Sequence, residues 1–230
     1  CSSDLQSGAR VMIADLNTEA AAQTAQEIAQ QTGNEVKSVM CNILDDAQLV
    51  NAVEMTLQAF GSLHILVNNA GGGGGREAPD QITVDDFIRD FQLNVFAAWR
   101  LCQLAAPHMQ QAGYGSIINI TSMSSINKSP AMSGYAASKA ALNHMGANLA
   151  HDFGPSIRIN AVGPGAIRTA ALEKVMTPEI EKRMLAHTPL QRLGEAQDIA
   201  GAVLFFAAPI SSWISGQTLF VNGGGVQTLD

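Results

Sequence analysis

The chain has 230 residues, of which 47% are hydrophobic and 14% are charged, and its formal net charge is −7. This composition excludes a disordered chain, which would be rich in charge and poor in apolar residues. The basic residues form no cluster, which argues against a nucleic-acid surface or an anionic membrane patch. No run of 18 apolar residues occurs, so the sequence predicts no transmembrane helix.

The start of the chain does not match the beginning of an α/β domain. It opens on Cys1, and the segment 1–4 matches no expected element, so we interpret that segment as non-native. The segment 5–8 resembles a helix end with a glycine stop, and a buried strand follows it directly. We therefore expect an N-terminally truncated domain; the alternative is a short protein.

Continuous apolar runs and helical periodicities alternate along the rest of the chain. We expect strands at 9–14, 35–41, 63–67, 116–120, 156–162 and 217–221. We expect helices at 17–31, 45–60, 83–111, 133–153 and 195–207, and a helical pair within 171–187 that Pro178 interrupts.

This alternation predicts an α/β fold with a doubly wound parallel sheet, as one domain spanning 1–230. Ligands of such sheets bind beyond the carboxyl ends of the strands. Polar or glycine-rich positions follow five predicted strands, at Asp15, Asn42, Asn69, Ser122 and Pro164.

Tyr135 and Lys139 lie four residues apart on a predicted helix and therefore share a face. A phenol with a pKa of about 10 is a poor base at neutral pH. A nearby cation favours the phenolate and lowers that pKa, so Tyr135 would exchange a proton with a hydroxyl or carbonyl oxygen. The alternative is a surface helix with an ordinary lysine.

Two further residues fit the same chemistry. Ser122 follows a strand and would reach the same space to hydrogen-bond a substrate oxygen; alternatively, it is a turn residue. Asn94 lies inside a predicted helix, where asparagine is disfavoured. It would hold water behind Lys139 in a proton relay; alternatively, it marks a kink or bonds to backbone.

Several motifs together resemble the classical short-chain dehydrogenase/reductase family, over the chain from about residue 6 to its end. The motifs are Asn68-Asn69-Ala70-Gly71, Leu93-Asn94-Val95, Ile120-Thr121-Ser122, Tyr135-x-x-x-Lys139, Pro164-Gly165 and the final Gly216-Gln217 to Asn222-Gly223-Gly224.

The resemblance implies a Rossmann-type fold, a homotetramer and hydride transfer between a nicotinamide and a secondary alcohol or ketone. It implies that Tyr135 is the acid/base, that Lys139 binds ribose, that Ser122 orients the substrate and that Asn94 supports the relay. It also implies a set of cofactor contacts: Asp15, Leu16, Asn42, Ile43, Asn69, Ala70, Gly71, Tyr135, Lys139, Pro164, Gly165, Ile167 and Thr169.

The implied cofactor is NAD. A carboxylate at Asp15 binds ribose hydroxyls and repels a 2′-phosphate, and no arginine follows it. The alternative is that Asp15 is the N-cap of the next helix. Asn42 stands where the family has an adenine-binding aspartate, and its amide oxygen still offers an acceptor.

Within the family the likeness is greatest to hydroxysteroid dehydrogenases, which implies a bile-acid 7α-hydroxyl as substrate, contacted by Gly73, Ser122, Asn127 and Tyr135. The segment 75–79 departs from that likeness. Alternative substrates are a 3-oxoacyl thioester, a sugar or a diketone. The non-enzymatic alternatives are a cofactor-sensing member of the fold or an inactive fragment.

The family's glycine-rich phosphate loop after the first strand is missing from the sequence. The run 71–75 does not replace it, because no helix follows directly. The resemblance puts the missing strand between 9–14 and 63–67, so we expect those edges to be unpaired or paired with each other. We expect this chain alone to be aggregation-prone, weakly cooperative in melting and inactive.

Three cysteines, Cys1, Cys41 and Cys102, lie far apart without a CxxC pair, so we interpret them as free thiols of a cytoplasmic protein. His144 and His151 lie seven residues apart, but a metal would need more ligands, and we expect no metal site.

Overall fold

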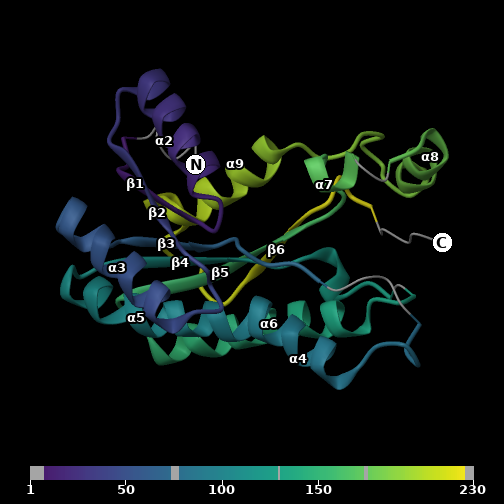
Figure 1. Cartoon of the computed structure of the whole chain (residues 1–230), viewed down its shortest axis with the longest axis horizontal. Coiled ribbons are helices and arrows are strands. Elements are labelled where there is room, and N and C mark those ends of the chain that lie inside the picture. The colour runs from purple at the N-terminus through teal and green to yellow at the C-terminus, as the bar shows by residue number, and fades with distance from the viewer. Residues whose placement is uncertain (1–7, 74–77, 129, 174–175, 226–230) are drawn as a thin grey trace.

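Parallel strands alternate with helices along most of the chain (Figure 1). The computed structural model describes residues 8–73, 78–128, 130–173 and 176–225. The strands are β1 (Val11–Asp15), β2 (Val36–Met40), β3 (Ile65–Asn68), β4 (Gly115–Ile120), β5 (Ile157–Pro164) and β6 (Thr218–Val221). The helices are α2 (Thr18–Thr32), α3 (Asp46–Phe60), α4 (Val84–Phe91), α5 (Ala97–Gln111), α6 (Ser133–Asp152), α7 (Ala170–Glu173), α8 (Pro178–Ala186) and α9 (Ala196–Ala207), with the π-helical turn η1 (Gln92–Phe96) and the 3₁₀ turns η2 (Met123–Ser125) and η3 (Pro209–Ser211).

The strands form two parallel sheets. Hydrogen bonds join β3, β4, β5 and β6 in that order, and β1 pairs with β2 separately. Helices α5 and α6 cover one face of the larger sheet, and α9 covers the other (Figure 1). The predicted α/β fold with parallel strands and helices on both faces is confirmed.

The core lies on both sides of β4 and β5. Ile117 faces α5 and α6 and packs with Met109, whereas its neighbour Ile118 faces α9 and packs with Phe206. Successive side chains of a strand point to opposite faces, so a strand buried on both faces reads as a continuous apolar run. This is why the sequence predicted these strands closely.

Local capping signals set the ends of several helices. The side chain of Asn17 accepts a hydrogen bond from Ala20 N at the start of α2, and Gly33 ends that helix with φ +73°. Asp45 caps α3 in the same way, accepting from Ala47 N. Pro178 is the first residue of α8, where its missing N–H costs nothing, so the predicted interruption before α8 is confirmed.

The predicted helical segment over 83–111 is confirmed in its extent, because helical backbone runs without a break from Val84 to Gln111, but it contains an irregularity that the sequence did not predict. The segment divides into α4, the π-helical turn η1 and α5. The π turn contains Asn94, whose side chain bonds to backbone outside the helix rather than to solvent. Such turns accommodate one extra residue and occur often at functional sites.

Strands β1 and β3 each have an edge without a hydrogen-bonded strand neighbour among the described residues. The expectation that these edges stay unpaired is confirmed, and the two strands do not pair with each other. Ile65 and Val67 of β3 are consequently 36% and 37% exposed. One contact of the smaller sheet with α3 is made by Arg10, whose guanidinium donates to Phe60 O at 2.8 Å.

The sequence also led to expectations about the cysteines and about membrane-spanning helices. Cys41 and Cys102 are buried free thiols, as predicted, whereas Cys1 and the segment 1–4 lie outside the described residues. Across the described parts of the chain, no helix combines the length and apolar character that crossing a bilayer requires.

The divided sheet predicts unequal local stability. We expect backbone amides of β1 and β2 to exchange with solvent hydrogen faster than those of β4 and β5, because the smaller sheet is partly exposed and has fewer paired edges. Hydrogen–deuterium exchange followed by NMR measures this directly. Equal protection of β1 and β4 would contradict it.

Candidate active site

The candidate site lies at the carboxyl ends of β3, β4 and β5. Asn69 follows β3, Ser122 follows β4 and Pro164 ends β5. The carboxyl ends of parallel strands meet at one edge of a sheet, where α/β proteins bind ligands. Helix α6 packs beside this edge and contributes Tyr135 and Lys139 from its first two turns.

Lys139 is buried against the end of β4. Its side chain is 4% exposed, and Nζ donates to the Ile120 carbonyl at 2.9 Å. Nζ also lies 5.9 Å from the centre of the Tyr135 ring, as the shared helix face predicts. Burial disfavours the ammonium form and lowers the pKa of Lys139 to about 8.

The expectation of a lowered pKa at Tyr135 is wrong for this arrangement. Burial raises the pKa of the Tyr135 phenol, because a phenolate away from water is disfavoured. The hydrogen bond with Ser122 acts in the opposite direction, and the carboxylate of Asp90 raises the pKa further. Helical spacing indicates the lysine charge, whereas burial and the approach of Asp90 arise only in the packed fold.

Ser122 is both a turn residue and a hydrogen-bonding residue of the site, the two alternatives that the sequence left open. Its hydroxyl bonds to Tyr135, and its Oγ also accepts from Ser124 N at 3.1 Å at the start of η2. Ser125 Oγ donates to the Ser122 carbonyl at 2.7 Å, and Asn143 Nδ2 donates to Ser125 Oγ at 2.8 Å. Ser122 is therefore a turn residue that is held in place beside the phenol.

Asn94 is 2% exposed, and its amide is occupied by protein groups. Oδ1 accepts from Gly72 N at 3.0 Å, while Nδ2 donates to Gly72 O at 2.6 Å and to Ser138 Oγ at 3.0 Å. The loop after β3 that contains Gly71, Gly72 and Gly73, called the glycine loop below, is thus fixed against η1 by this side chain. The two alternatives drawn from the sequence for Asn94, a helix kink and a bond to backbone, both apply. A part in the proton relay stays a prediction.

The glycine loop approaches the site more closely than any other residue type would allow. A Cβ at Gly71 would lie 2.6 Å from Asn94 Oδ1 and 3.0 Å from Lys139 Nζ. A Cβ at Gly73 would lie 2.7 Å from the Tyr135 ring. Contacts this short do not occur, so glycine is required for steric reasons at both positions. Asn69 and Ala70, also predicted to line the cofactor, are exposed.

Asp15 lies at the carboxyl end of β1 and is exposed. Its Oδ1 accepts from Asn17 N at 2.8 Å, and Asn17 rather than Asp15 caps α2, so the N-cap interpretation of Asp15 is wrong. Leu16 beside it is 70% exposed. An exposed carboxylate at a strand end is placed as a ribose contact requires.

Asn42 and Ile43 follow β2. The oxygen of Asn42 that the sequence offered to adenine accepts from Leu44 N at 3.1 Å. Ile43 packs against the buried cluster that contains Cys41 and Leu49. Both residues thus have local structural contacts, and their contact with a cofactor stays a prediction.

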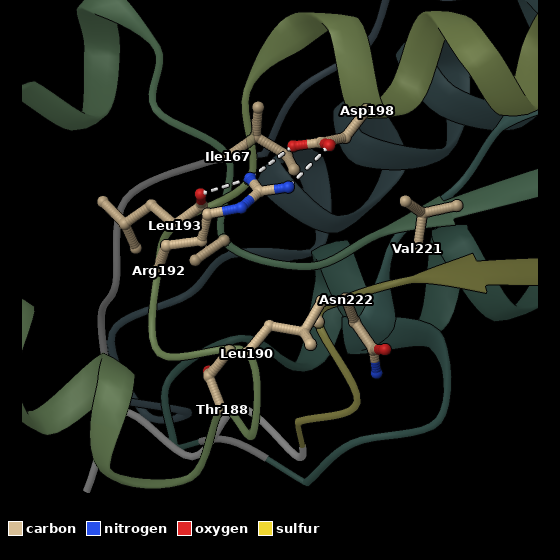
Figure 2. Close-up of a pocket in the computed structure, with 11 residues that line it drawn as sticks. Ile167, Thr188, Leu190, Arg192, Leu193, Asp198, Val221 and Asn222 are labelled. Atoms are coloured by element: carbon tan, nitrogen blue, oxygen red, sulfur yellow. Dashed lines mark hydrogen bonds and ion pairs between the residues drawn. The ribbon is translucent and has the colours of Figure 1, made fainter.

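The loop after β5 borders a pocket (Figure 2). Gly165 N donates to Val221 O at 2.9 Å, and Ile167 lines the pocket together with Val221 and Asn222 from the end of β6. Thr169 Oγ1 accepts from Leu172 N at 3.2 Å. None of Ser122, Tyr135 and Lys139 lines this pocket, so it adjoins the predicted cofactor loop rather than the reacting groups.

The predicted substrate contacts are brought together only in part. Gly73 and Ser122 both lie against Tyr135, whereas Asn127 lies at the end of the loop after β4, where its N–H donates to Met123 O at 2.9 Å. Most of the divergent segment 75–79 is outside the described residues. No group of three His, Cys, Asp or Glu side chains suited to a metal occurs within the described ranges.

Two features of the site escaped the sequence argument. The Asn143–Ser125 bond behind Ser122 joins residues 18 positions apart, and nothing in their spacing indicated it. Asp90 is a buried acid beside α6, only 8% exposed. The sequence did not single it out, because α4 also contains the charged residues Asp85, Asp86 and Arg89.

Comparisons with known proteins agree with this geometry. The family model described as "Enoyl-(Acyl carrier protein) reductase" matches residues 4–225. The chain is 47% identical to 7alpha-hydroxysteroid dehydrogenase of Escherichia coli, over 97% of this chain and 87% of that protein. It is 35% identical to 7alpha-hydroxysteroid dehydrogenase of Clostridium sardiniense, over 94% of this chain and 84% of that protein.

A solved structure is similar over nearly the whole chain. It is a 7 alpha-hydroxysteroid dehydrogenase complexed with NADH and 7-oxo glycochenodeoxycholic acid, with a TM-score of 0.93 and 47% identity. The match covers 98% of this chain and 88% of that one.

The steric argument at the glycine loop yields a prediction. Substituting Gly73→Ala forces its Cβ into the Tyr135 ring, so we expect turnover to fall by roughly a hundredfold while the melting temperature changes little. Gly72→Ala is the matched comparison, because its Cβ would meet nothing closer than 3.6 Å. Equal effects of the two substitutions on kcat would contradict the argument.

Proposed function

The chain belongs to the short-chain dehydrogenase/reductase family, and we propose that it transfers a hydride between NAD(H) and a secondary alcohol or ketone. One observation carries this proposal: the phenol of Tyr135 is bonded to Ser122 and lies beside the buried ammonium of Lys139. A protein that only senses a cofactor has no use for a phenol, hydroxyl and ammonium arranged for proton exchange.

The residues fit a dinucleotide in two respects. Asp15 offers an exposed carboxylate at the end of β1, and the glycine at position 71 leaves open the space beside Lys139 that a Cβ would fill. We assign ribose binding to Asp15 and Lys139, and lining of the cofactor to Asn69, Ala70 and Gly71. The nicotinamide supplies the hydride acceptor in oxidation and the hydride donor in reduction.

The chain's own groups handle the proton. In alcohol oxidation the Tyr135 phenolate takes the hydroxyl proton while Ser122 Oγ hydrogen-bonds the substrate oxygen; in reduction the phenol returns a proton to the carbonyl oxygen. The raised pKa of Tyr135 keeps the phenol protonated at neutral pH. This state suits reduction, and oxidation therefore gains from alkaline pH.

Removing the proton carrier tests the central assignment. In a full-length version that carries the family's glycine-rich loop, we expect Tyr135→Phe to lower kcat by roughly 10²–10⁴-fold, because a positioned acid/base contributes about that much, while the affinity for NAD stays nearly unchanged. Steady-state kinetics and calorimetry give the two quantities. A variant that keeps more than about a tenth of the rate would remove Tyr135 from the mechanism.

The exposed carboxylate of Asp15 favours NAD over NADP, because it repels a 2′-phosphate. In the same full-length version, we expect Asp15→Ala to reduce the ratio of kcat/KM for NAD to that for NADP. Glu19→Ala is the control, since Glu19 is also an exposed acid at the start of α2. An unmodified enzyme that used NADP better would overturn the assignment.

For the substrate we propose the 7α-hydroxyl of a bile acid, oxidised to the 7-ketone. The similarity to the E. coli and C. sardiniense enzymes supports this choice, as does the 7-oxo bile acid in the solved relative. Gly73, Ser122, Asn127 and Tyr135 are the residues assigned to contact it. A 3-oxoacyl thioester, a sugar or a diketone is the alternative.

A substrate panel separates these alternatives. With NAD⁺ we expect the absorbance of NADH to rise with 7α-hydroxy bile acids and not with their 7β epimers, because the hydride must leave from one face of the steroid. Full activity on a 3-oxoacyl thioester or small diketone with none on bile acids would reject the steroid assignment while retaining the family.

We further propose a cytoplasmic homotetramer. The free thiols of Cys41 and Cys102 suit a reducing compartment. The apolar face of α9 packs on the sheet and so needs no partner subunit. Support for association comes instead from exposed apolar side chains after α9, where Ile210 is 80% and Trp213 is 99% exposed.

A further inference from the structure

Asp90 on α4 is a buried carboxylate next to the first turn of α6. It is 8% exposed, and a Cβ at Gly134, the residue before Tyr135, would lie 2.7 Å from Asp90 Oδ2. The N-cap position of α6, Met132, makes no side-chain hydrogen bond to the helix. The carboxylate therefore lies where the positive end of the α6 dipole favours an anion.

The identity of residue 134 agrees with this placement. Glycine is unfavourable within a helix by roughly 1 kcal/mol relative to alanine, and Gly134 does not have the positive φ that would require it. The same Cβ would also lie 3.3 Å from the Phe87 ring, so space is the physical reason for glycine here. A side chain at position 134 would collide with the Asp90 carboxylate.

We propose that Asp90 is a positioning residue whose negative charge, held against the start of α6, keeps Tyr135 in its protonated, proton-donating form. The inference rests on the proposed role of Tyr135 as acid/base and adds a determinant of its working pH. Buried charges interact through a low dielectric, so a carboxylate nearby disfavours a second negative charge on the phenol. The raised pKa of Tyr135 agrees in direction.

Among the residues that the structure describes, the other groups around the phenol do not supply this effect. On α6 the ammonium of Lys139 favours the phenolate, and Ser122 before η2 contributes an uncharged hydroxyl. On α4 the exposed Asp86 bonds to Thr83 and interacts with Arg89, where solvent screens its charge. Asp90 is thus the buried anion that opposes Lys139 at Tyr135.

The consequence is a bias between the two directions of the reaction. A phenol that stays protonated to higher pH is ready to donate a proton to a carbonyl oxygen, whereas alcohol oxidation must wait for the phenolate. Asp90 therefore favours reduction near neutral pH and raises the pH at which the rate of oxidation increases.

The test measures the phenol without relying on turnover. The chain has two tyrosines, so protein labelled with [¹³Cζ]tyrosine gives two NMR signals, which Tyr114→Phe assigns. In Asp90→Asn, which keeps the shape and removes the charge, we expect the Tyr135 midpoint to fall by about half a pH unit while Tyr114 is unchanged. Asp85→Asn, an exposed acid on the same helix, is the control and leaves both midpoints in place.

The pH profile of kcat/KM for oxidation should shift to lower pH together with the titration midpoint of Tyr135. If Asp90→Asn does not fold, Asp90→Ala removes the same charge and leaves the space beside Gly134. An unchanged Tyr135 midpoint in a folded variant overturns the proposal and leaves Asp90 a purely structural residue. A shifted midpoint in a protein without turnover upholds Asp90 and counts against the proposed function instead.

Discussion

The buried ammonium of Lys139 is the constraint on which the candidate site depends. Removing a cation from water costs free energy unless polar groups replace the water, and the Ile120 carbonyl at the end of β4 is such a group. That bond joins α6 to the end of β4, in addition to the apolar packing of α6 on the sheet. Tyr135, one turn before Lys139 on α6, lies beside Ser122. Next to the Lys139 ammonium there is room only for a glycine at position 71.

The π-helical turn follows from the same geometry. Asn94 must leave the regular helix to hold both backbone groups of Gly72, and this bond keeps the glycine loop close to Lys139. The turn divides a long helical segment, so that α4 and η1 pack against α6. The division thereby brings Asp90 to Gly134. A local irregularity in one helix thus arranges groups on both sides of Tyr135.

The parts that the sequence predicted are those with short-range causes. The ends of α2 and α3 follow from caps at Asn17 and Asp45, and the strands of the larger sheet follow from continuous apolar runs. Tyr135 and Lys139 are brought together by helical spacing alone. The π turn, the Asn143–Ser125 bond and the burial of Asp90 depend on contacts between distant segments, which no local pattern encodes. The direction of the pKa shift at Tyr135 was missed for the same reason, because burial is a property of the packed fold.

The residues proposed for proton transfer and two of those proposed for cofactor binding lie on different sheets. Ser122, Tyr135 and Lys139 are attached to β4 and α6, in the part of the core that is buried on both faces. Asp15 and Asn42 are attached to β1 and β2, which join the rest of the protein through the Arg10 contact with Phe60 and the cluster around Cys41. Disturbance of the smaller sheet should therefore reach the cofactor's adenosine end first and leave the geometry of the proton-transferring groups intact. The proposed proton-transferring groups thus stand on the sheet that is buried on both faces, whereas the proposed cofactor contacts Asp15 and Asn42 stand on the smaller sheet.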